Sequence, residues 1–142
     1  MRTITTEIAI AAPPARVWEA LMGFAAYGDW NPFVTSISGD SSVGGRLDVA
    51  IEPPGGKPMR FHPAVTAHEP ERLFQWLGSL GVKGVFDGRH SFRLSPTEHG
   101  TRFEHREDFT GLLGFLMSGA RRDQTEAGFR AMNEALKAHC EG

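Results

Sequence analysis

The fold is decided by two stretches of sequence, VFDGRHSFRL at residues 85–94 and TRFEHREDF at residues 101–109. Apolar and charged residues alternate along both, which is the period of a β-strand with one buried face. The turn-forming residues 95–100 lie between them, so the two stretches predict an antiparallel hairpin. Its buried face is expected to hold Phe86, Gly88, His90, Phe92 and Leu94 from the first strand and Phe103, His105, Glu107 and Phe109 from the second.

A turn centred on residues 95–100 would set the pairing of this hairpin. The expected opposed pairs are Phe92 with Phe103, His90 with His105, Gly88 with Glu107, and Phe86 with Phe109. Opposed Cβ atoms lie about 5 Å apart, so the two imidazoles and the carboxylate can form one network. A buried carboxylate without a partner is costly in free energy, so Glu107 must be paired, protonated or in contact with water in a cavity. Gly88 would leave room in front of it.

Three roles remain open for His90, His105 and Glu107. They can be a polar network that is satisfied within the core, or a polar patch that orients a ligand in an apolar pocket. They can also, with or without His62, be a zinc or iron site. The sequence contains no helical metal motif, so we expect no metal and no cofactor. The ligand patch is the interpretation that we favour.

The period of the sequence changes after Phe109. Between Leu112 and Ala138 the apolar residues recur at helical spacing. Glycines at 114, 119 and 128 weaken a helix, so we expect a kink or a late start near Ser118–Arg122. One stripe of this helix would face the sheet, and it comprises Phe129, Met132 and Leu136, with Asn133 at its margin. Arg121 and Arg122 are interpreted as a solvated face.

The first half of the chain adds two short helices and more strands. Residues 4–10 alternate as a strand, and Pro13-Pro14 then opens a short helix that Gly23 ends. A second short helix leads into a strand at Phe33–Ile37. Further strands are expected at residues 44–51, 57–68 and 72–80, with a turn at 81–84 after the last of them. The order predicts an α+β fold, a bent antiparallel sheet of about seven strands around a long C-terminal helix.

Composition limits the class of protein. The 142 residues suit one domain, residues 1–142, that can bury its own core. A net charge of −2 favours neither nucleic acid nor anionic lipid as a partner. The lone Cys140 excludes an internal disulfide. No signal peptide and no apolar run long enough for a membrane span is visible, so we expect a cytoplasmic protein, either a monomer or a homodimer. Walker, dinucleotide-binding and nucleophilic-hydrolase motifs are also missing.

Six segments resemble one known superfamily. They are PPARVWEAL at 13–21, YGDWNPF at 27–33, EPERLFQW at 69–76, FDGRHSF at 86–92, FTGLL at 109–113 and FRAMNEALK at 129–137. Together they are similar to the START-like helix-grip superfamily, also called SRPBCC, and most closely to its bacterial polyketide cyclase/dehydrase-like branch. The resemblance covers nearly the whole chain. It implies a deep cavity between the sheet and the last helix, and it carries over no catalytic motif of the true cyclases.

We therefore predict a protein that binds a small, mostly apolar or amphipathic molecule. The polar contacts would come from His90, His105 and Glu107, and further contacts from Trp30, Phe33, Phe61, Trp76, Phe92, Phe103, Phe109, Phe129, Met132 and Asn133. Any single aromatic residue can equally well fill the core. One alternative is a cyclase, isomerase or dehydratase that uses the His/Glu cluster as acid and base. The other is an accessory protein, like the chaperone activators of the superfamily, which would act through an exposed apolar patch and have a filled interior.

Overall fold

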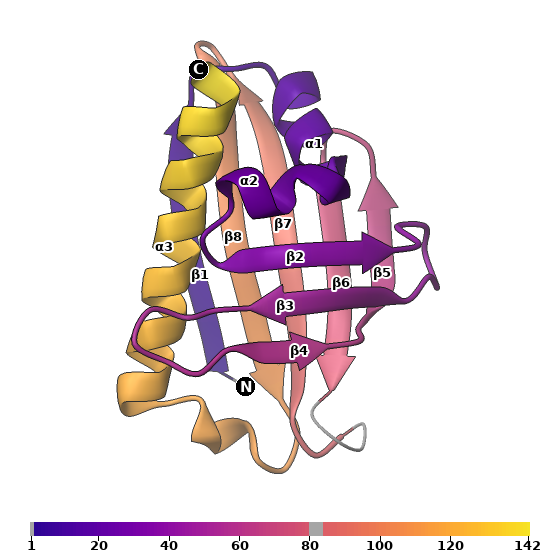
Figure 1. Ribbon diagram of the computed structural model, residues 1–142, viewed down its shortest axis with the longest axis vertical. Helices are drawn as coiled ribbons and strands as arrows, with labels where there is room; N and C mark the ends of the chain where they lie inside the picture. Colours follow the sequence, from indigo (N-terminus) through magenta and orange to yellow (C-terminus); the bar gives the residue numbers. More distant parts are fainter. Residues whose placement is uncertain (1, 80–83) are drawn as a thin grey trace.

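Two antiparallel sheets face each other in the computed structural model, which describes residues 2–79 and 84–142 (Figure 1). The larger sheet has the order β1 (Arg2–Ile10), β8 (Gly100–Thr110), β7 (Asp87–Thr97), β6 (Leu73–Ser79) and β5 (Ala64–Glu69). The smaller sheet has the order β2 (Val34–Gly39), β3 (Leu47–Ile51) and β4 (Met59–Phe61). The α+β class and the antiparallel strands are as predicted.

The sheets are joined where the backbone passes from β4 to β5. An isolated bridge pairs Arg46 with Ala64, and the amide of Leu47 donates to the carbonyl of Pro63. Residues 57–68, expected as one strand, therefore form two short strands, β4 and β5. Pro63 lies between them and has no amide hydrogen with which to continue a ladder. This division raises the described strands to eight and makes two sheets of the expected bent one.

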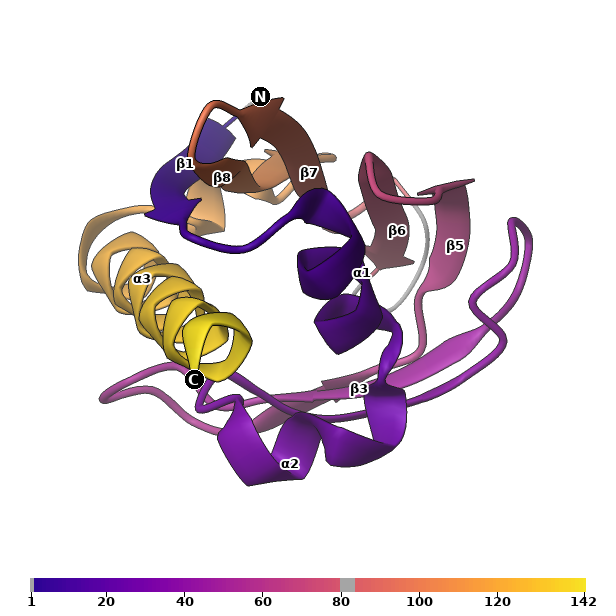
Figure 2. The ribbon, with the colours of Figure 1, turned by 90° about the horizontal axis from the view of Figure 1, so that it is seen from above.

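A long C-terminal helix, α3 (Gly119–Glu141), closes one side of the space between the sheets, next to the edge strand β1 (Figure 2). The expected late start is confirmed, because a 3-10 turn, η2 (Gly114–Leu116), precedes the helix. The stripe formed by Phe129, Met132 and Leu136 is fully buried, also as expected. The short elements α1 (Pro14–Met22), η1 (Phe24–Ala26) and α2 (Tyr27–Trp30) follow β1 and lie near the C-terminal end of α3.

The β7–β8 hairpin differs from its predicted pairing by two residues. Its loop consists only of Glu98 and His99, because Thr97 already pairs with Gly100. The observed pairs are consequently His90 with Glu107, Phe92 with His105, Leu94 with Phe103, and Gly88 with Phe109. The prediction assumed a six-residue turn, whereas Ser95 and Pro96 continue the strand. A shift of two residues preserves the faces, so the buried set is the predicted one.

The turn expected at residues 81–84 falls mainly on residues 80–83, which lie outside the described residues.

Within residues 2–79 and 84–142, no helix is long and apolar enough to cross a membrane.

Gly128 provides a test of how tightly α3 packs. A Cβ at this position would lie 2.3 Å from Cδ1 of Phe33. Alanine in place of glycine gains about 1 kcal/mol inside a helix, but overpacking costs about 1–3 kcal/mol. We expect Gly128→Ala to lower the free energy of unfolding, measured by urea denaturation, and Phe33→Leu in the same chain to restore part of the loss. A more stable Gly128→Ala protein would contradict this packing.

Candidate functional site

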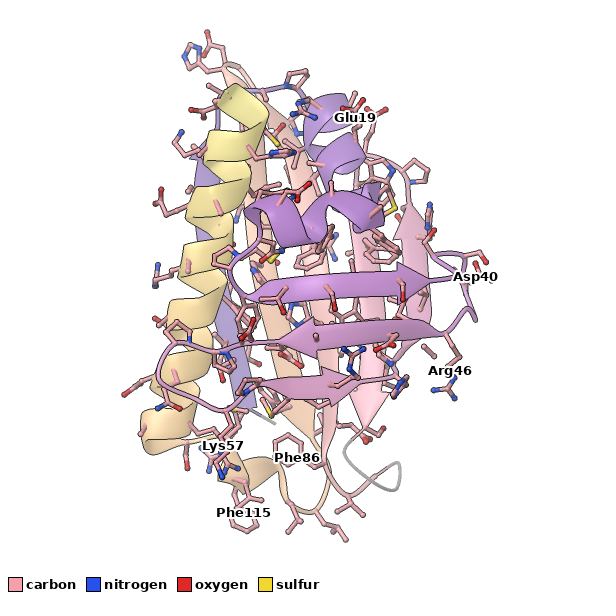
Figure 3. All side chains as sticks on the ribbon, in the orientation of Figure 1. Glu19, Asp40, Arg46, Lys57, Phe86 and Phe115 are labelled. Carbon is pink, nitrogen blue, oxygen red and sulfur yellow. The ribbon has the colours of Figure 1, made fainter. Side chains whose placement is uncertain are left out.

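A pocket of about 620 Å³ lies between the two sheets at the end of the molecule where α3 begins. Strands β3, β4, β6, β7 and β8, the loop 53–58 and the first turns of α3 all contribute to it. Apolar side chains make most of its wall, and they include Phe33, Ile51, Phe61, Trp76, Phe86, Phe109 and Met117. Figure 3 shows Phe86 and Lys57, both of the pocket wall, at this end of the molecule.

A His–Glu pair supplies the polar wall at the inner side of the pocket. Nδ1 of His90 lies 3.2 Å from Oε1 of Glu107, and the indole of Trp76 stacks on the His90 ring. The side chain of His90 is 1% exposed and that of Glu107 is 16% exposed. A Cβ on Gly88 would lie 2.3 Å from Oε2 of Glu107. The room that Gly88 was expected to leave is therefore occupied by the carboxylate of Glu107 itself.

The second histidine continues this pair into the core. Nε2 of His90 lies 2.7 Å from Nε2 of His105, and Nδ1 of His105 lies 3.0 Å from Oδ1 of Asn133. Nδ2 of Asn133 then donates to the hydroxyl of Thr6 over 2.8 Å. That hydroxyl donates to the carbonyl of His105 over 3.3 Å. Each of the buried side chains in this network, His90, His105, Asn133 and Thr6, thus has a partner, as buried polar groups require.

This chain of contacts assigns the protons. Because Asn133 presents its oxygen to Nδ1 of His105, that nitrogen must donate. Nε2 of a neutral His105 is then an acceptor, so Nε2 of His90 donates to it. Nδ1 of His90 is left facing a carboxylate oxygen of Glu107. One proton must lie in this last contact, on His90 or on Glu107, since two lone pairs would repel each other.

His105 is held in its neutral form. Burial in the core is the main cause that places the pKa of His105 well below its ordinary value of 6.5, and the charge of the neighbouring His90 lowers it further. The hydrogen bond to Asn133 opposes these effects only in part. The ring of Phe129 stacks on His105 with centroids 3.9 Å apart. His105 is therefore a neutral, packed member of the core rather than a second acid beside His90.

The structure divides the predicted site residues into two groups. His90, Glu107, Phe33, Phe61, Trp76 and Phe109 line the pocket. The rest do not line it. His105, Asn133, Phe92, Phe103, Phe129 and Met132 are buried in the core beside it. Trp30 is half-buried and stacks on His139, near the C-terminal end of α3. Contact of the first group with a ligand remains a prediction.

Several residues of the pocket wall were absent from the predicted site. Arg121, Gln124 and Thr125 come from the start of α3, and Lys57 comes from the loop between β3 and β4. The spacing 121, 124, 125 is that of one helix face, and this signal becomes readable once the helix start is known. Arg122, on the next face, pairs with Glu126 at 2.9 Å. Arg121 is exposed and Arg122 partly exposed, as the interpretation of a solvated face expects, and Arg121 also lines the pocket.

The alternative of a metal site requires a cluster of donor side chains. Residues 2–79 and 84–142 contain no group of three or more His, Cys, Asp or Glu side chains placed to hold one ion. His62, the fourth ligand considered, has an exposed side chain 3.9 Å from Asp48.

The depressed pKa of His105 predicts a pH-dependent stability. The unfolded chain protonates this residue near pH 6.5, whereas the folded protein does so only at much lower pH. Below about pH 6.5 the unfolded state thus binds more protons, and the free energy of unfolding falls by up to about 1.4 kcal/mol per pH unit. Carboxylates with a lowered pKa, such as Glu126, also make stability depend on pH, but only in a more acidic range, below their ordinary pKa of 4.5.

The measurement compares urea denaturation at about pH 7.5 and about pH 5.5 for the natural protein and for His105→Gln, which keeps an amide partner for Asn133. The natural protein should lose more stability than the variant between the two pH values. Equal losses would show that His105 does not carry the effect.

The fold is similar to that of several solved structures. Protein MLL2253 from Mesorhizobium loti is 23% identical, with a TM-score of 0.70, over 99% of this chain and 97% of the other. TTHA0849 from Thermus thermophilus is 16% identical, with a TM-score of 0.77, over 99% and 97%. The di-domain ARO/CYC StfQ of the steffimycin biosynthetic pathway is 16% identical, with a TM-score of 0.74, over 98% of this chain and 50% of that one.

These likenesses establish the helix-grip architecture. No curated protein matches the chain. The family described as "Polyketide cyclase / dehydrase and lipid transport" matches residues 1–141. The chain belongs to this family.

Proposed function

We propose that the protein binds a small, mostly apolar molecule in the pocket between its two sheets, with one polar group of the ligand directed at Glu107. The observation that carries the proposal is an apolar pocket of about 620 Å³ with a single buried His–Glu pair in its wall. Small-molecule sites commonly have this volume and this composition, apolar surface with a few placed polar groups. The family description, which names cyclases and lipid transport, supports it.

Glu107 is the polar group that a ligand would meet. Both nitrogens of His90 are already engaged, one by Glu107 and one by His105. Glu107 uses Oε1 for His90, and its Oε2 has no hydrogen-bond partner among the described residues. Because the shared proton lies between Oε1 of Glu107 and Nδ1 of His90, Oε2 can only accept a hydrogen bond. A ligand hydroxyl is therefore the matching group.

Binding can be measured with N-phenylnaphthylamine, a neutral apolar probe whose fluorescence rises in apolar sites. We expect saturable binding to the purified protein and a loss of about tenfold or more in Gly78→Leu. Gly78 lines the pocket, and a Cβ there would make only ordinary contact with Pro63. Ser38→Leu, on an exposed position of β2, is the matched control. Equal titration curves for the two variants would reject the pocket as the binding site.

A second candidate function is acid–base catalysis on a bound carbonyl compound. The specific observation is the single proton shared by His90 and Glu107 at the pocket wall, which provides an acid and a base in one contact. Such a pair could remove a proton beside a ketone, the step that cyclases and isomerases share. An exposed apolar patch with a filled interior would favour the accessory-protein alternative, and the pocket speaks against a filled interior.

Catalysis predicts deuterium exchange at the carbon next to the carbonyl of a ketone that fits the pocket, such as tetralone. In deuterated buffer the natural protein should exchange this position faster than buffer alone, and Glu107→Gln should reduce the rate by about a hundredfold. Glu104→Gln, on the opposite face of β8, is the control and should leave the rate unchanged. Exchange at the buffer rate with the ketone bound would leave binding as the function.

A further inference from the structure

We propose that the ligand is an amphipathic anion whose acidic end group is held at the mouth of the pocket by Lys57 and Arg121. The apolar body of such a molecule would fill the pocket, and a carboxylate, sulfonate or phosphate would lie between the two cations. The proposal rests on the proposed binding function and adds the chemical class of the ligand.

The two cations come from two neighbouring elements of the pocket wall. Lys57 lies in the loop between β3 and β4, and Arg121 lies in the first turn of α3. Both line the pocket and both are exposed, whereas the inner wall around His90 and Trp76 is buried. Figure 3 shows Lys57 at this end of the molecule, close to Phe86 of the pocket wall. An anion at this end of the pocket would therefore have both cations within the same wall.

Neither cation is neutralised by a neighbouring acid. Within residues 2–79 and 84–142, Lys57 and Arg121 take part in no ion pair. Other cations of the same helix are paired, Arg122 and Arg130 with Glu126, and Lys137 with Glu141. Glu107 is the sole acid among the described residues of the pocket wall. The mouth thus carries an uncompensated positive charge that would attract and orient an anion.

The two elements that carry the cations are tied together. Gln124, one turn after Arg121, donates from Nε2 to the carbonyl of Gly55 over 3.1 Å. Gly56 allows this close approach, because a Cβ there would lie 3.2 Å from Oε1 of Gln124. The loop that carries Lys57 is therefore fastened to the helix that carries Arg121. This contact joins the two backbone segments that carry the cations before a ligand arrives, which reduces the entropy cost of binding.

The inner wall offers an anion no comparable site. His90 and Glu107 share one proton, so the pair is neutral overall in either arrangement, and His105 behind it is neutral. An acidic group placed there would face the carboxyl group of Glu107 and no net positive charge. The same charges therefore favour one orientation, with the uncharged end of the ligand, which carries the polar group that meets Glu107, inward and the anion outward.

A matched pair of probes separates this proposal from the binding function itself. Anilinonaphthalene sulfonate and N-phenylnaphthylamine share one aromatic skeleton, and only the first carries a sulfonate. We expect the double variant Lys57→Gln/Arg121→Gln to weaken the sulfonate about five- to tenfold and to leave the neutral probe within twofold. Added salt should weaken the sulfonate in the natural protein and have little effect in the double variant.

The control is Arg89→Gln/Arg93→Gln, which removes the same charge from exposed positions of β7 on the outer face of the sheet. The proposal is overturned if this control weakens the sulfonate as much as the mouth variant does, or if the mouth variant weakens both probes equally. Failure of the neutral probe to bind the natural protein would instead reject the binding function.

Discussion

A chain of buried hydrogen bonds through His105 is the constraint on which the rest of the structure depends. It joins Thr6 of β1, Asn133 of α3, His105 of β8 and His90 of β7. Leaving any one of these groups without its partner would cost about 1–3 kcal/mol. Asn133 can satisfy both Thr6 and His105 only at one position of α3 along the sheet. The polar network thus fixes the helix, and the helix fixes where space remains.

That space is at one end because the rest of the interior is filled. Phe129 stacks on His105, and Gly128 lets Phe33 approach the helix backbone. Beyond these contacts, toward the C-terminus, Met132 and Leu136 are fully buried. In the first turns of α3, Arg121, Gln124 and Thr125 border the pocket instead. The same helix therefore serves as core over one part of its length and as pocket wall over the other.

The sequence predicted the faces of the strands better than their pairing. Alternation alone placed His90, His105 and Glu107 on one buried face, and that face is correct because a shift of two residues preserves it. The pairing depends on loop length, and residues 95–97 read as turn formers although they extend β7. The pocket residues of α3 could not be predicted, since they depend on where the helix starts and on Gln124 binding the distant loop at Gly55. Local patterns do not contain such contacts.

Whether this fold binds or also converts its ligand depends on the path of one proton. A helix-grip fold by itself does not decide between the two functions. His105 donates from Nδ1 to Asn133, and its lowered pKa makes a second proton at Nε2 unfavourable near neutral pH. The proton shared by His90 and Glu107 therefore cannot pass into the core. Its one outlet is Oε2 of Glu107, at the pocket wall, so any proton transfer must involve the ligand or water in the pocket. The core network thus supports the His90–Glu107 pair at the pocket wall, where Oε2 of Glu107 is left without a partner among the described residues.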